Sequence, residues 1–191
     1  MKRIVLASLI LIAAFNLFAQ KNETCLIKTK WGDITVELYT SKAPATVANF
    51  LKYADAHLYD SSSFFRSVTL ENQPKDSIKI EVIQGGIIDS AKEFKPILLE
   101  TTKQTGILHK SGIISMARGE PNSATSSFFI CINDQPALDF GGKRNKDGQG
   151  FAAFGKVTDG MEVVKKIQQV DPKGEQYLSK PVIILSVRRV E

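Results

Sequence analysis

The sequence predicts a mainly β fold in which strands form a barrel and a helix plugs its open end. Residues 26–39 alternate apolar and polar side chains on either side of Trp31-Gly32-Asp33, which is the pattern of a β-hairpin. Residues 41–54 then change to helical spacing. A chain of 191 residues can form one domain with a sizeable core, and no internal repeat or second domain is evident.

The predicted helix over residues 41–54 is followed by a strand. Pro44 stands near the start of the helix, and Thr46 is expected to cap its first turn. After a turn at residues 59–63, Phe64-Phe65-Arg66 opens the strand. The apolar face of the helix consists of Val47, Phe50, Leu51 and Ala54.

Residues 67–83 are expected to form an elongated hairpin. The strand continues through Val68 and Leu70, turns over residues 71–76 and returns through the alternating apolar residues of 78–82. This hairpin could extend or gate a binding surface, as functional loops do. It could equally be a tolerated insertion, because lengthening a surface loop costs little free energy.

Residues 111–133 have the pattern strand, polar loop, strand. An apolar run at 113–116 precedes a loop rich in Ser, Thr and Asn at 119–127, whose short side chains can bond their own backbone. Phe128 and Phe129 begin the second strand. Because side chains alternate along a strand, one ring is expected in the core and the other in a groove.

The remaining segments complete the barrel. Residues 87–112 are rich in loop, with Glu93 and Glu100 expected in solvent. Residues 141–150 form a flexible, partly basic loop, which we expect to be solvated. A strand over 151–157, a helix from Gly160-Met161 with Val163, Val164 and Ile167 on its apolar face, and a closing strand over 181–190 follow.

The segment from Ser111 to Asn133 resembles the signature of the cyclophilin-type peptidyl-prolyl isomerases, particularly their bacterial branch. The shared residues are Ser-Met-Ala-Arg at 115–118, Pro-x-Ser-Ala-Thr at 121–125 and Phe-Phe-Ile at 128–130. The resemblance extends from about Cys25 to Val190. It implies a closed antiparallel eight-stranded β-barrel capped by two α-helices, and peptidyl-prolyl cis-trans isomerase activity that needs no cofactor.

The resemblance also implies a site. Arg66 matches the arginine of the family's Phe-His-Arg triplet and would donate a hydrogen bond to the prolyl nitrogen, while Gln84 would bond near the substrate carbonyl. His109 resembles a residue common in the family, for which we expect a structural or surface role. Phe129, Leu138, Val82 and Met116 would form the proline cup, although each could equally be core, and the backbone of Ala117 and Arg118 would align the residue before proline.

Five positions depart from the family pattern. A carboxylate at Glu81, where the family has a pocket Phe, could pair with Arg66 and occupy its donors. Loss of the pocket Trp at Ala137 removes part of the apolar wall. We therefore expect weaker or narrower activity than in a standard member. The other departures are Phe65 in place of His, Phe151 in place of His or Tyr, and Ser127 in place of Gln.

The N-terminus has the layout of a secretory signal peptide over residues 1–19, with cleavage before Gln20 and the isomerase domain at 20–191. The apolar run is shorter than the ~20 residues that a membrane anchor needs. A lipid anchor at Cys25 is disfavoured, because Asn22-Glu23-Thr24 lacks the small apolar residues of a lipoprotein signal. We expect an exported protein, periplasmic or secreted, without a membrane attachment after cleavage.

Charge and cysteine content limit the possible partners. The net charge of +5 falls by the two charges of Lys2 and Arg3 on cleavage, and no basic cluster interleaved with aromatics indicates nucleic-acid binding. Cys25 and Cys131 could pair in an oxidising compartment, but two buried thiols are the favoured interpretation. With only two histidines, no metal site is predicted.

Three functional hypotheses remain open at this point. The first is a monomeric isomerase that acts on proline-containing peptides and on unfolded or exported proteins. The second is a proline-peptide binding module or chaperone with weak or no isomerase activity, because several pocket positions are altered. The third is a structural β-barrel domain in an envelope assembly.

Overall fold

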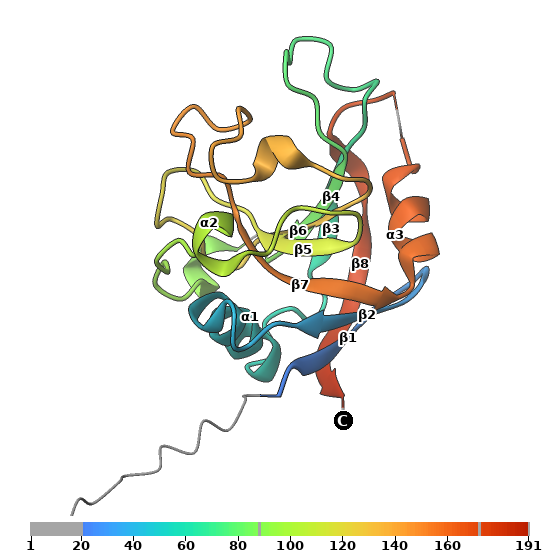
Figure 1. Ribbon diagram of the computed structural model, residues 1–191. Coiled ribbons are helices and arrows are strands. Elements are labelled where there is room, and N and C mark those ends of the chain that lie inside the picture. Colours follow the sequence, from blue (N-terminus) through green and yellow to red (C-terminus); the bar gives the residue numbers. More distant parts are fainter. Residues whose placement is uncertain (1–20, 88, 172, 191) are drawn as a thin grey trace, which may run out of the picture.

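The computed structural model describes residues 21–87, 89–171 and 173–190, so the predicted signal peptide lies outside the described residues. Eight strands form a closed antiparallel barrel in the order β1-β2-β7-β5-β6-β4-β3-β8, as expected from the sequence (Figure 1). The strands are β1 (Glu23–Thr29), β2 (Gly32–Leu38), β3 (Ser63–Val68), β4 (Val82–Gly86), β5 (Ile113–Met116), β6 (Phe128–Cys131), β7 (Ala152–Asp159) and β8 (Tyr177–Val190).

Two main helices lie on opposite sides of the barrel, α1 (Pro44–Asp55) and α3 (Met161–Gln168) (Figure 1). Both contribute side chains to the core within the barrel, which confirms the predicted capping. Shorter helical segments occur at α2 (Thr102–Thr105), Ser90–Lys92 and Pro136–Leu138. Among the described residues, no helix is long and apolar enough to cross a bilayer.

The start of α1 differs from the sequence prediction. The helix begins at Pro44, and Thr46 lies inside its first turn instead of capping it. The Glu100 carboxylate accepts hydrogen bonds from the backbone N–H of Ala45 (3.2 Å) and Thr46 (2.8 Å) and from the Thr46 hydroxyl (2.6 Å). An acceptor 54 residues away therefore satisfies the helix terminus, which local sequence reasoning could not find.

Glu93 also has a structural role instead of lying free in solvent. Its carboxylate accepts hydrogen bonds from the hydroxyls of Thr125 (2.8 Å) and Ser126 (2.6 Å). The expectation that Glu93 and Glu100 are solvated is thus wrong. Both carboxylates brace loop-rich segments against neighbouring parts of the fold.

The interior of the barrel is filled by aromatic and β-branched side chains. Phe128 is fully buried and meets the rings of Phe50, Tyr59 and Phe64 edge-on at centroid distances of 5.5–5.8 Å. Edge-to-face contacts of this kind stabilise a core beyond the burial of apolar area alone. Phe128 is therefore the core member of the double-phenylalanine pair.

A second, smaller apolar cluster lies on the outer face of β3, β4 and β6. Phe129 belongs to it, as predicted from the alternation of side chains. We call it the outer cluster, and its buried members are Val68, Ile80, Val82, Phe129, Cys131 and Leu138.

The expected elongated hairpin is a compact loop over residues 69–81, which projects from the barrel beyond β3 and β4 (Figure 1). β3 ends at Val68 and β4 begins only at Val82, so the predicted strand residues Leu70, Ile78 and Ile80 are not in strands. The reason is a side-chain amide. Buried Gln73 donates to the carbonyls of Thr69 (2.6 Å) and Ile80 (2.7 Å) and accepts from the Ile80 N–H (3.2 Å), replacing a backbone ladder.

The two cysteines are free thiols, as the favoured interpretation held. Cys25 lies on β1 and Cys131 on β6, which are separated by three strands in either direction around the barrel. Cys25 belongs to the interior core, whereas Cys131 belongs to the outer cluster. Burial raises the pKa of Cys25 to about 12 and also raises the pKa of Cys131.

We expect both thiols to be inert in the folded protein. Thiolate is the reactive form, and at pH 8 neither buried group ionises appreciably. A chromogenic disulfide reagent should label no cysteine of the native protein and two cysteines in guanidinium chloride. Rapid labelling of either thiol in the native state would contradict this burial.

Gln73→Ala should destabilise the protein by ~1–3 kcal/mol, because it leaves buried backbone groups of Thr69 and Ile80 without partners. Urea unfolding measures the change. The matched control in the same loop is Leu70→Ala. Leu70 is 48% exposed, so truncation of its side chain should cost less. Equal effects of the two substitutions would show that the amide does not hold the loop.

Candidate active site

Antiparallel register places the predicted site residues in one row across the outside of the barrel. Arg66 on β3 is the partner of Gln84 on β4, and Gln84 is the partner of Phe129 on β6. Phe129 is in turn the partner of Ser115 on β5. Because paired residues point to the same face of a sheet, this row brings the cationic, amide and aromatic groups together.

Gln84 owes its place to the two glycines that follow it. A Cβ on Gly85 would lie 2.9 Å from the Phe64 ring, and a Cβ on Gly86 would lie 2.8 Å from Cα of Ser127. Gly86 also has a φ of +140°, a conformation that side chains rarely adopt. The end of β4 can therefore lie flat against its neighbours, with Gln84 facing outward.

Two glutamine side chains hold the Arg66 guanidinium. Nη1 donates to Oε1 of Gln84 at 2.9 Å. Nε and Nη2 both donate to Oε1 of Gln176, at 3.2 and 2.6 Å. Partial burial lowers the pKa of Arg66, but an arginine stays protonated in a protein. A positive charge is thus held in a fixed direction beside the outer cluster.

A hollow of about 250 Å³ lies next to Arg66 on this face. Its lining combines the polar side chains of Arg66, Gln84 and Arg118 with apolar and aromatic side chains. Its size and mixed lining suit a small apolar ring whose flanking chain makes hydrogen bonds. The lining residues are Arg66, Ile80, Val82, Gln84, Ala117, Arg118, Phe129, Leu138, Phe151 and Tyr177.

The predicted site residues are brought together with one exception. Met116 is fully buried in the interior core and does not line the hollow, so its assignment to the proline cup is wrong. The reason is strand alternation: Met116 is the partner of Phe128, which faces inward, whereas Ser115 is the partner of Phe129, which faces outward.

Glu81 does not pair with Arg66, contrary to the sequence hypothesis. Its carboxylate accepts from the Asn133 side chain at 2.8 Å, and its carbonyl accepts from the Ile132 N–H at 3.0 Å. The donors of Arg66 go to Gln84 and Gln176 instead. Glu81 therefore gives no reason to expect that the arginine is neutralised.

The Arg118 side chain joins the hollow to the loop at 141–150. The side chain is 1% exposed, and its guanidinium donates to the carbonyl of Gly150 at 2.8 Å and to both carboxylate oxygens of Asp147 at 2.7 and 3.0 Å. The guanidinium also lies 5.3 Å from the Phe151 ring centroid. These contacts fix one wall of the hollow and give order to a segment expected to be flexible.

The backbone at 117–118 is partly committed. The Ala117 N–H donates to the Ser127 carbonyl at 2.8 Å. Anchoring of a bound peptide by this backbone would therefore use the Ala117 carbonyl or the peptide group of Arg118.

His109 has the structural role that we expected. The ring is buried, with Nδ1 2.7 Å from the Asp139 carboxylate and Nε2 2.9 Å from the Ser115 hydroxyl. It also stacks against Phe129 at a centroid distance of 5.9 Å. His109 supports the floor of the hollow from behind and is absent from its lining.

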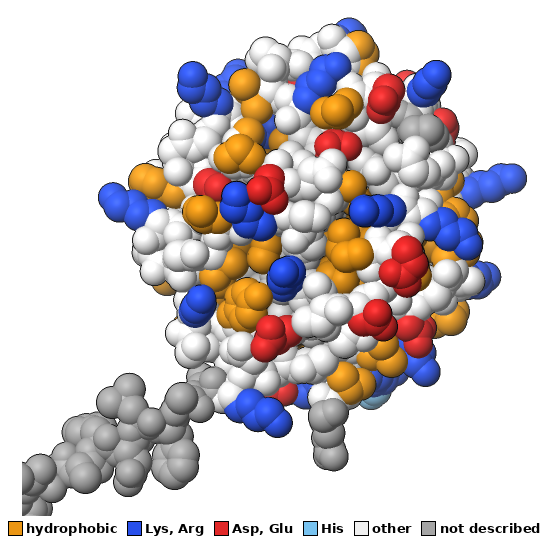
Figure 2. Space-filling model, turned by 45° about the vertical axis from the view of Figure 1, so that its right-hand side comes forward, with side chains coloured by type: hydrophobic (Ala, Val, Ile, Leu, Met, Phe, Trp, Pro, Cys, Tyr) orange, Lys and Arg blue, Asp and Glu red, His pale blue; other side chains and the backbone are white. Residues whose placement is uncertain are grey.

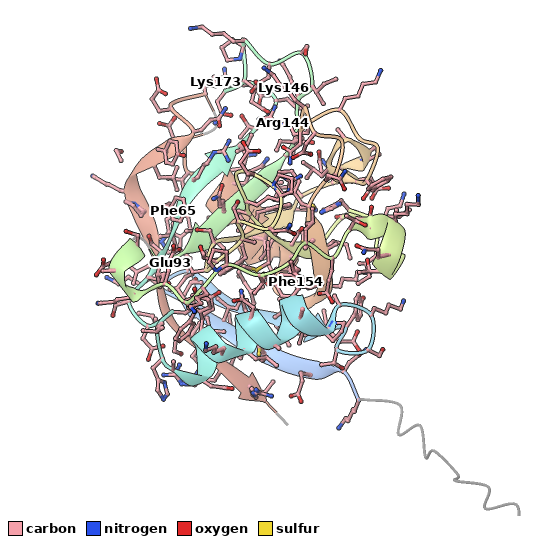
Figure 3. The ribbon with its side chains drawn as sticks, turned by 90° about the vertical axis from the view of Figure 1, so that its left-hand side faces the viewer. Phe65, Glu93, Arg144, Lys146, Phe154 and Lys173 are labelled. Carbon is pink, nitrogen blue, oxygen red and sulfur yellow. The ribbon has the colours of Figure 1, made fainter. Side chains whose placement is uncertain are left out.

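The loop at 141–150 is joined to the loop at 69–81. Arg144 donates to the Ile78 carbonyl at 2.6 Å and lies 3.3 Å from Asp76. Arg144 and Lys146 lie close together at one end of the molecule in Figure 3, away from the buried Phe154. Elsewhere acidic and basic side chains are interspersed over the face drawn in Figure 2, so no single charge sign covers it.

Sequence reasoning missed Ile80, Gln176 and Tyr177. Ile80 was assigned to a strand face, and only the closed loop turns it into the hollow. Tyr177, 68% exposed, stacks on Phe65 at 6.4 Å and lies 5.8 Å from the Arg66 guanidinium. Gln176 precedes β8 and lies 110 residues from Arg66, with no motif that could have indicated the contact.

No group of three or more His, Cys, Asp or Glu side chains suited to a metal ion occurs in the described part of the chain.

The chain is similar to cyclophilin-type isomerases in sequence and in structure. The family described as "Cyclophilin type peptidyl-prolyl cis-trans isomerase/CLD" matches residues 24–189. Peptidyl-prolyl cis-trans isomerase A of Dickeya dadantii is 32% identical over the whole of both chains. Peptidyl-prolyl cis-trans isomerase B of Escherichia coli is 34% identical over 74% of this chain and 82% of its own length.

Solved structures share the fold. A crystal structure of a cyclophilin-type isomerase from Cryptosporidium parvum matches with a TM-score of 0.71 and 22% identity, covering 89% of this chain and 98% of the other. A second structure of that protein, determined in the presence of the dipeptide Ala-Pro, gives a TM-score of 0.68 and 23% identity over 86% and 96% of the two chains.

Asp147→Asn tests the anchor of loop 141–150. Hydrogen bonds from Arg118 and from the Gln149 N–H lower the pKa of Asp147. The ion pair therefore contributes stability above the ordinary carboxyl pKa of ~3.9, and this contribution is lost as the pH falls through the lowered value. At pH 7 we expect the variant to be less stable by about 1 kcal/mol, since Asp147 is partly exposed.

Urea unfolding of both proteins between pH 3 and 7 measures this difference, which should be constant above about pH 5 and shrink below about pH 4. Asp159→Asn at an exposed position serves as the control. A difference that persists unchanged at pH 3 would contradict an ionic origin.

Proposed function

Because the chain belongs to the cyclophilin-type peptidyl-prolyl cis-trans isomerase family, we propose that it catalyses rotation about X-Pro peptide bonds at the hollow beside Arg66. The observation that carries the proposal is the row of Arg66, Gln84 and Phe129 beside that hollow. Proline-containing peptides are the proposed ligands, and a structural relative was solved in the presence of Ala-Pro.

The chemistry requires no bond to be broken. Amide resonance sets a barrier of about 18–20 kcal/mol to rotation about the C–N bond. As the amide twists, the prolyl nitrogen recovers its lone pair and becomes a hydrogen-bond acceptor. A donor that waits at that position stabilises the twisted amide more than either planar form and so lowers the barrier.

Arg66 is the proposed donor. A guanidinium has five N–H groups, and three of them go to Gln84 and Gln176 within the described residues. One N–H on each of Nη1 and Nη2 is left for a substrate. The guanidinium borders the apolar wall of the hollow, where a hydrogen bond to a charged donor is stronger than in water.

Gln84 and the apolar wall are proposed to hold the substrate. Because Oε1 of Gln84 accepts from Arg66, its amide nitrogen is the end that can donate to a substrate carbonyl. Phe129, Leu138 and Val82 would enclose the proline ring. Ile80 and Phe151 would complete this cup, which partly makes up for the apolar wall lost at Ala137.

We further propose that the protein assists the folding of exported proteins. Support comes from the sequence of residues 1–19, which has the layout of a cleavable signal. Expression of the full chain in a Gram-negative host tests this: N-terminal sequencing of the periplasmic fraction should begin at Gln20. An unprocessed N-terminus would contradict export.

Binding without efficient catalysis is the second candidate. It is favoured by the altered positions at Phe65 and Ala137, and it predicts peptide affinity without acceleration of exchange. We retain the expectation that turnover is slower than in a standard member. A full rate on a simple proline tetrapeptide would contradict that expectation.

Arg66→Ala should lower kcat/KM for an X-Pro peptide by about 100-fold or more, the size of effect seen when a transition-state donor is removed. Line-shape or exchange NMR on a proline peptide measures the rate. Arg188→Ala, which removes an arginine paired with Asp60 near the end of β8, serves as the matched control and should leave the rate unchanged.

The outcomes separate the two candidates. Exchange that falls with Arg66→Ala supports the enzyme. Peptide binding with no measurable exchange in the wild-type protein supports the binding module. Exchange that proceeds equally with and without Arg66 would overturn the proposed mechanism.

A further inference from the structure

We propose that Gln176 is a positioning residue for Arg66, and that the inserted loop at 69–81 holds Gln176 in place. The proposal rests on the proposed catalytic role of Arg66. The sequence left open whether the insertion is functional or is a tolerated lengthening of a surface loop. The proposal assigns it a function, which is to support the arginine beside the hollow.

Gln84 and Gln176 hydrogen-bond two sides of the Arg66 guanidinium. Gln176 Oε1 accepts from Nε and Nη2 on one edge of the guanidinium plane, at 3.2 and 2.6 Å. Gln84 accepts from Nη1 at 2.9 Å. An unrestrained arginine side chain has about 2 kcal/mol of rotamer entropy to lose on ordering. Holding two sides of the plane supplies that order before a substrate arrives.

Gln176 is itself held by hydrogen bonds to β3 and to the inserted loop. Its carbonyl accepts from the Ser67 N–H at 2.8 Å, which joins its backbone to β3 next to Arg66. Its side-chain nitrogen donates to the Asn72 carbonyl at 3.3 Å, which joins its amide to the inserted loop. The amide is therefore oriented with its oxygen toward Arg66 and its nitrogen toward the loop.

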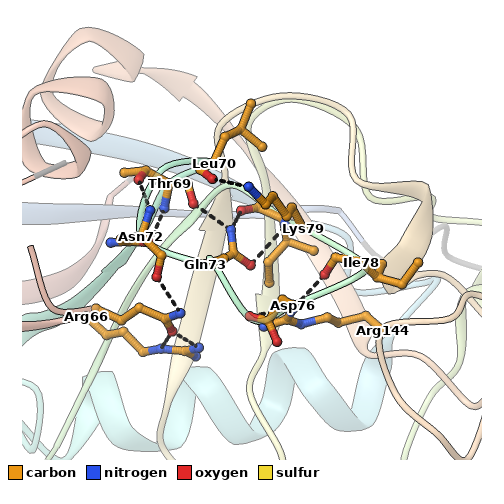
Figure 4. Close-up of polar contacts among 11 residues, drawn as sticks. Arg66, Thr69, Leu70, Asn72, Gln73, Asp76, Ile78, Lys79 and Arg144 are labelled. Carbon is orange, nitrogen blue, oxygen red and sulfur yellow. Dashed lines mark hydrogen bonds and ion pairs between the residues drawn. The ribbon is translucent and has the colours of Figure 1, made fainter. Parts of the chain in front are cut away.

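The inserted loop at 69–81 is fixed by the side chains of Asn72 and Gln73. Asn72 is 8% exposed and donates to the Ser67 carbonyl at 3.0 Å, while its side-chain oxygen accepts from the Thr69 N–H at 2.9 Å. Gln73 closes the base of the loop through Thr69 and Ile80. Hydrogen bonds thus link the base of the insertion through Asn72 and Gln176 to the guanidinium. Gln73, Asn72 and Arg66 are labelled in Figure 4.

The chemistry of an amide suits positioning better than blocking. A neutral carbonyl oxygen accepts from the guanidinium without cancelling its charge, whereas a carboxylate would form an ion pair. Two N–H groups stay available for the prolyl nitrogen, as counted above. Gln176 therefore fixes the direction of the donors and leaves the charge to act on the substrate.

Gln176→Met, which keeps the side-chain length and removes both polar atoms, tests the proposal. Isomerisation of a proline tetrapeptide is measured for the wild type, Gln176→Met, Arg66→Ala and the double variant. We expect Gln176→Met to lower kcat about tenfold with KM changed less than twofold, because substrate contacts stay while the donor loses its orientation. The matched control is the exposed Gln169→Met, which should not alter either constant.

Two further readouts separate positioning from a general structural role. The double variant should be no slower than Arg66→Ala alone, because the two residues act through one group. In ¹⁵N NMR, the Arg66 Nε–H should exchange slowly in the wild type and rapidly in Gln176→Met. If Gln176→Met does not fold, Asn72→Ala is the alternative variant. It removes the side chain that holds the loop and should also lower kcat.

The outcomes are distinguishable from failure of the proposed function. Wild-type kcat and Nε–H protection in Gln176→Met, with a slow Arg66→Ala, would overturn the positioning role alone. Unchanged kcat in Asn72→Ala would overturn the part assigned to the loop. A rate independent of Arg66 would overturn the proposed function on which this inference rests.

Discussion

The architecture depends on the alternation of side chains across a closed antiparallel sheet. Adjacent residues face opposite sides, so Phe128 fills the interior while Phe129 forms the floor of the hollow. Register then carries Arg66 and Gln84 to the same side as Phe129. A slip of one residue in any of these strands would exchange core and site together. Stability and the candidate active site are consequently specified by the same pairing.

Side-chain amides take over where the backbone ladder ends. Gln73 closes the inserted loop, and Asn72 joins it to β3. Carboxylates do the same elsewhere, as Glu100 does at the start of α1. Buried polar groups of this kind need all their partners, and they specify a conformation when they have them. Side-chain hydrogen bonds therefore fix the inserted loop where strand pairing does not reach.

Much of this arrangement could be predicted from the sequence. Period-two alternation predicted the hairpin of β1 and β2 and the opposite facing of Phe128 and Phe129, and helical spacing predicted α1 and α3. The resemblance predicted Arg66 and Gln84, which lie together. These features depend on local pattern or on a motif, and both are visible in a single chain.

Most of the errors come from hydrogen bonds made by single side chains. Alternating apolar residues suggested a strand at 78–82, but Gln73 bonds the backbone there and closes a loop. Thr46 looked like a helix cap until Glu100 supplied the acceptor. Gln176 reaches Arg66 across 110 residues without a motif. Contacts of single side chains at such separations leave no periodic signal, so sequence pattern alone cannot find them.

Closure of the barrel has a consequence for a protein proposed to work among unfolded chains. Every strand of the described barrel has a hydrogen-bonded neighbour on each side. An open sheet would present a row of unpaired N–H and carbonyl groups, onto which an extended polypeptide could add as a further strand. A cylinder without such a border offers an extended chain no main-chain template for β-aggregation along the described strands.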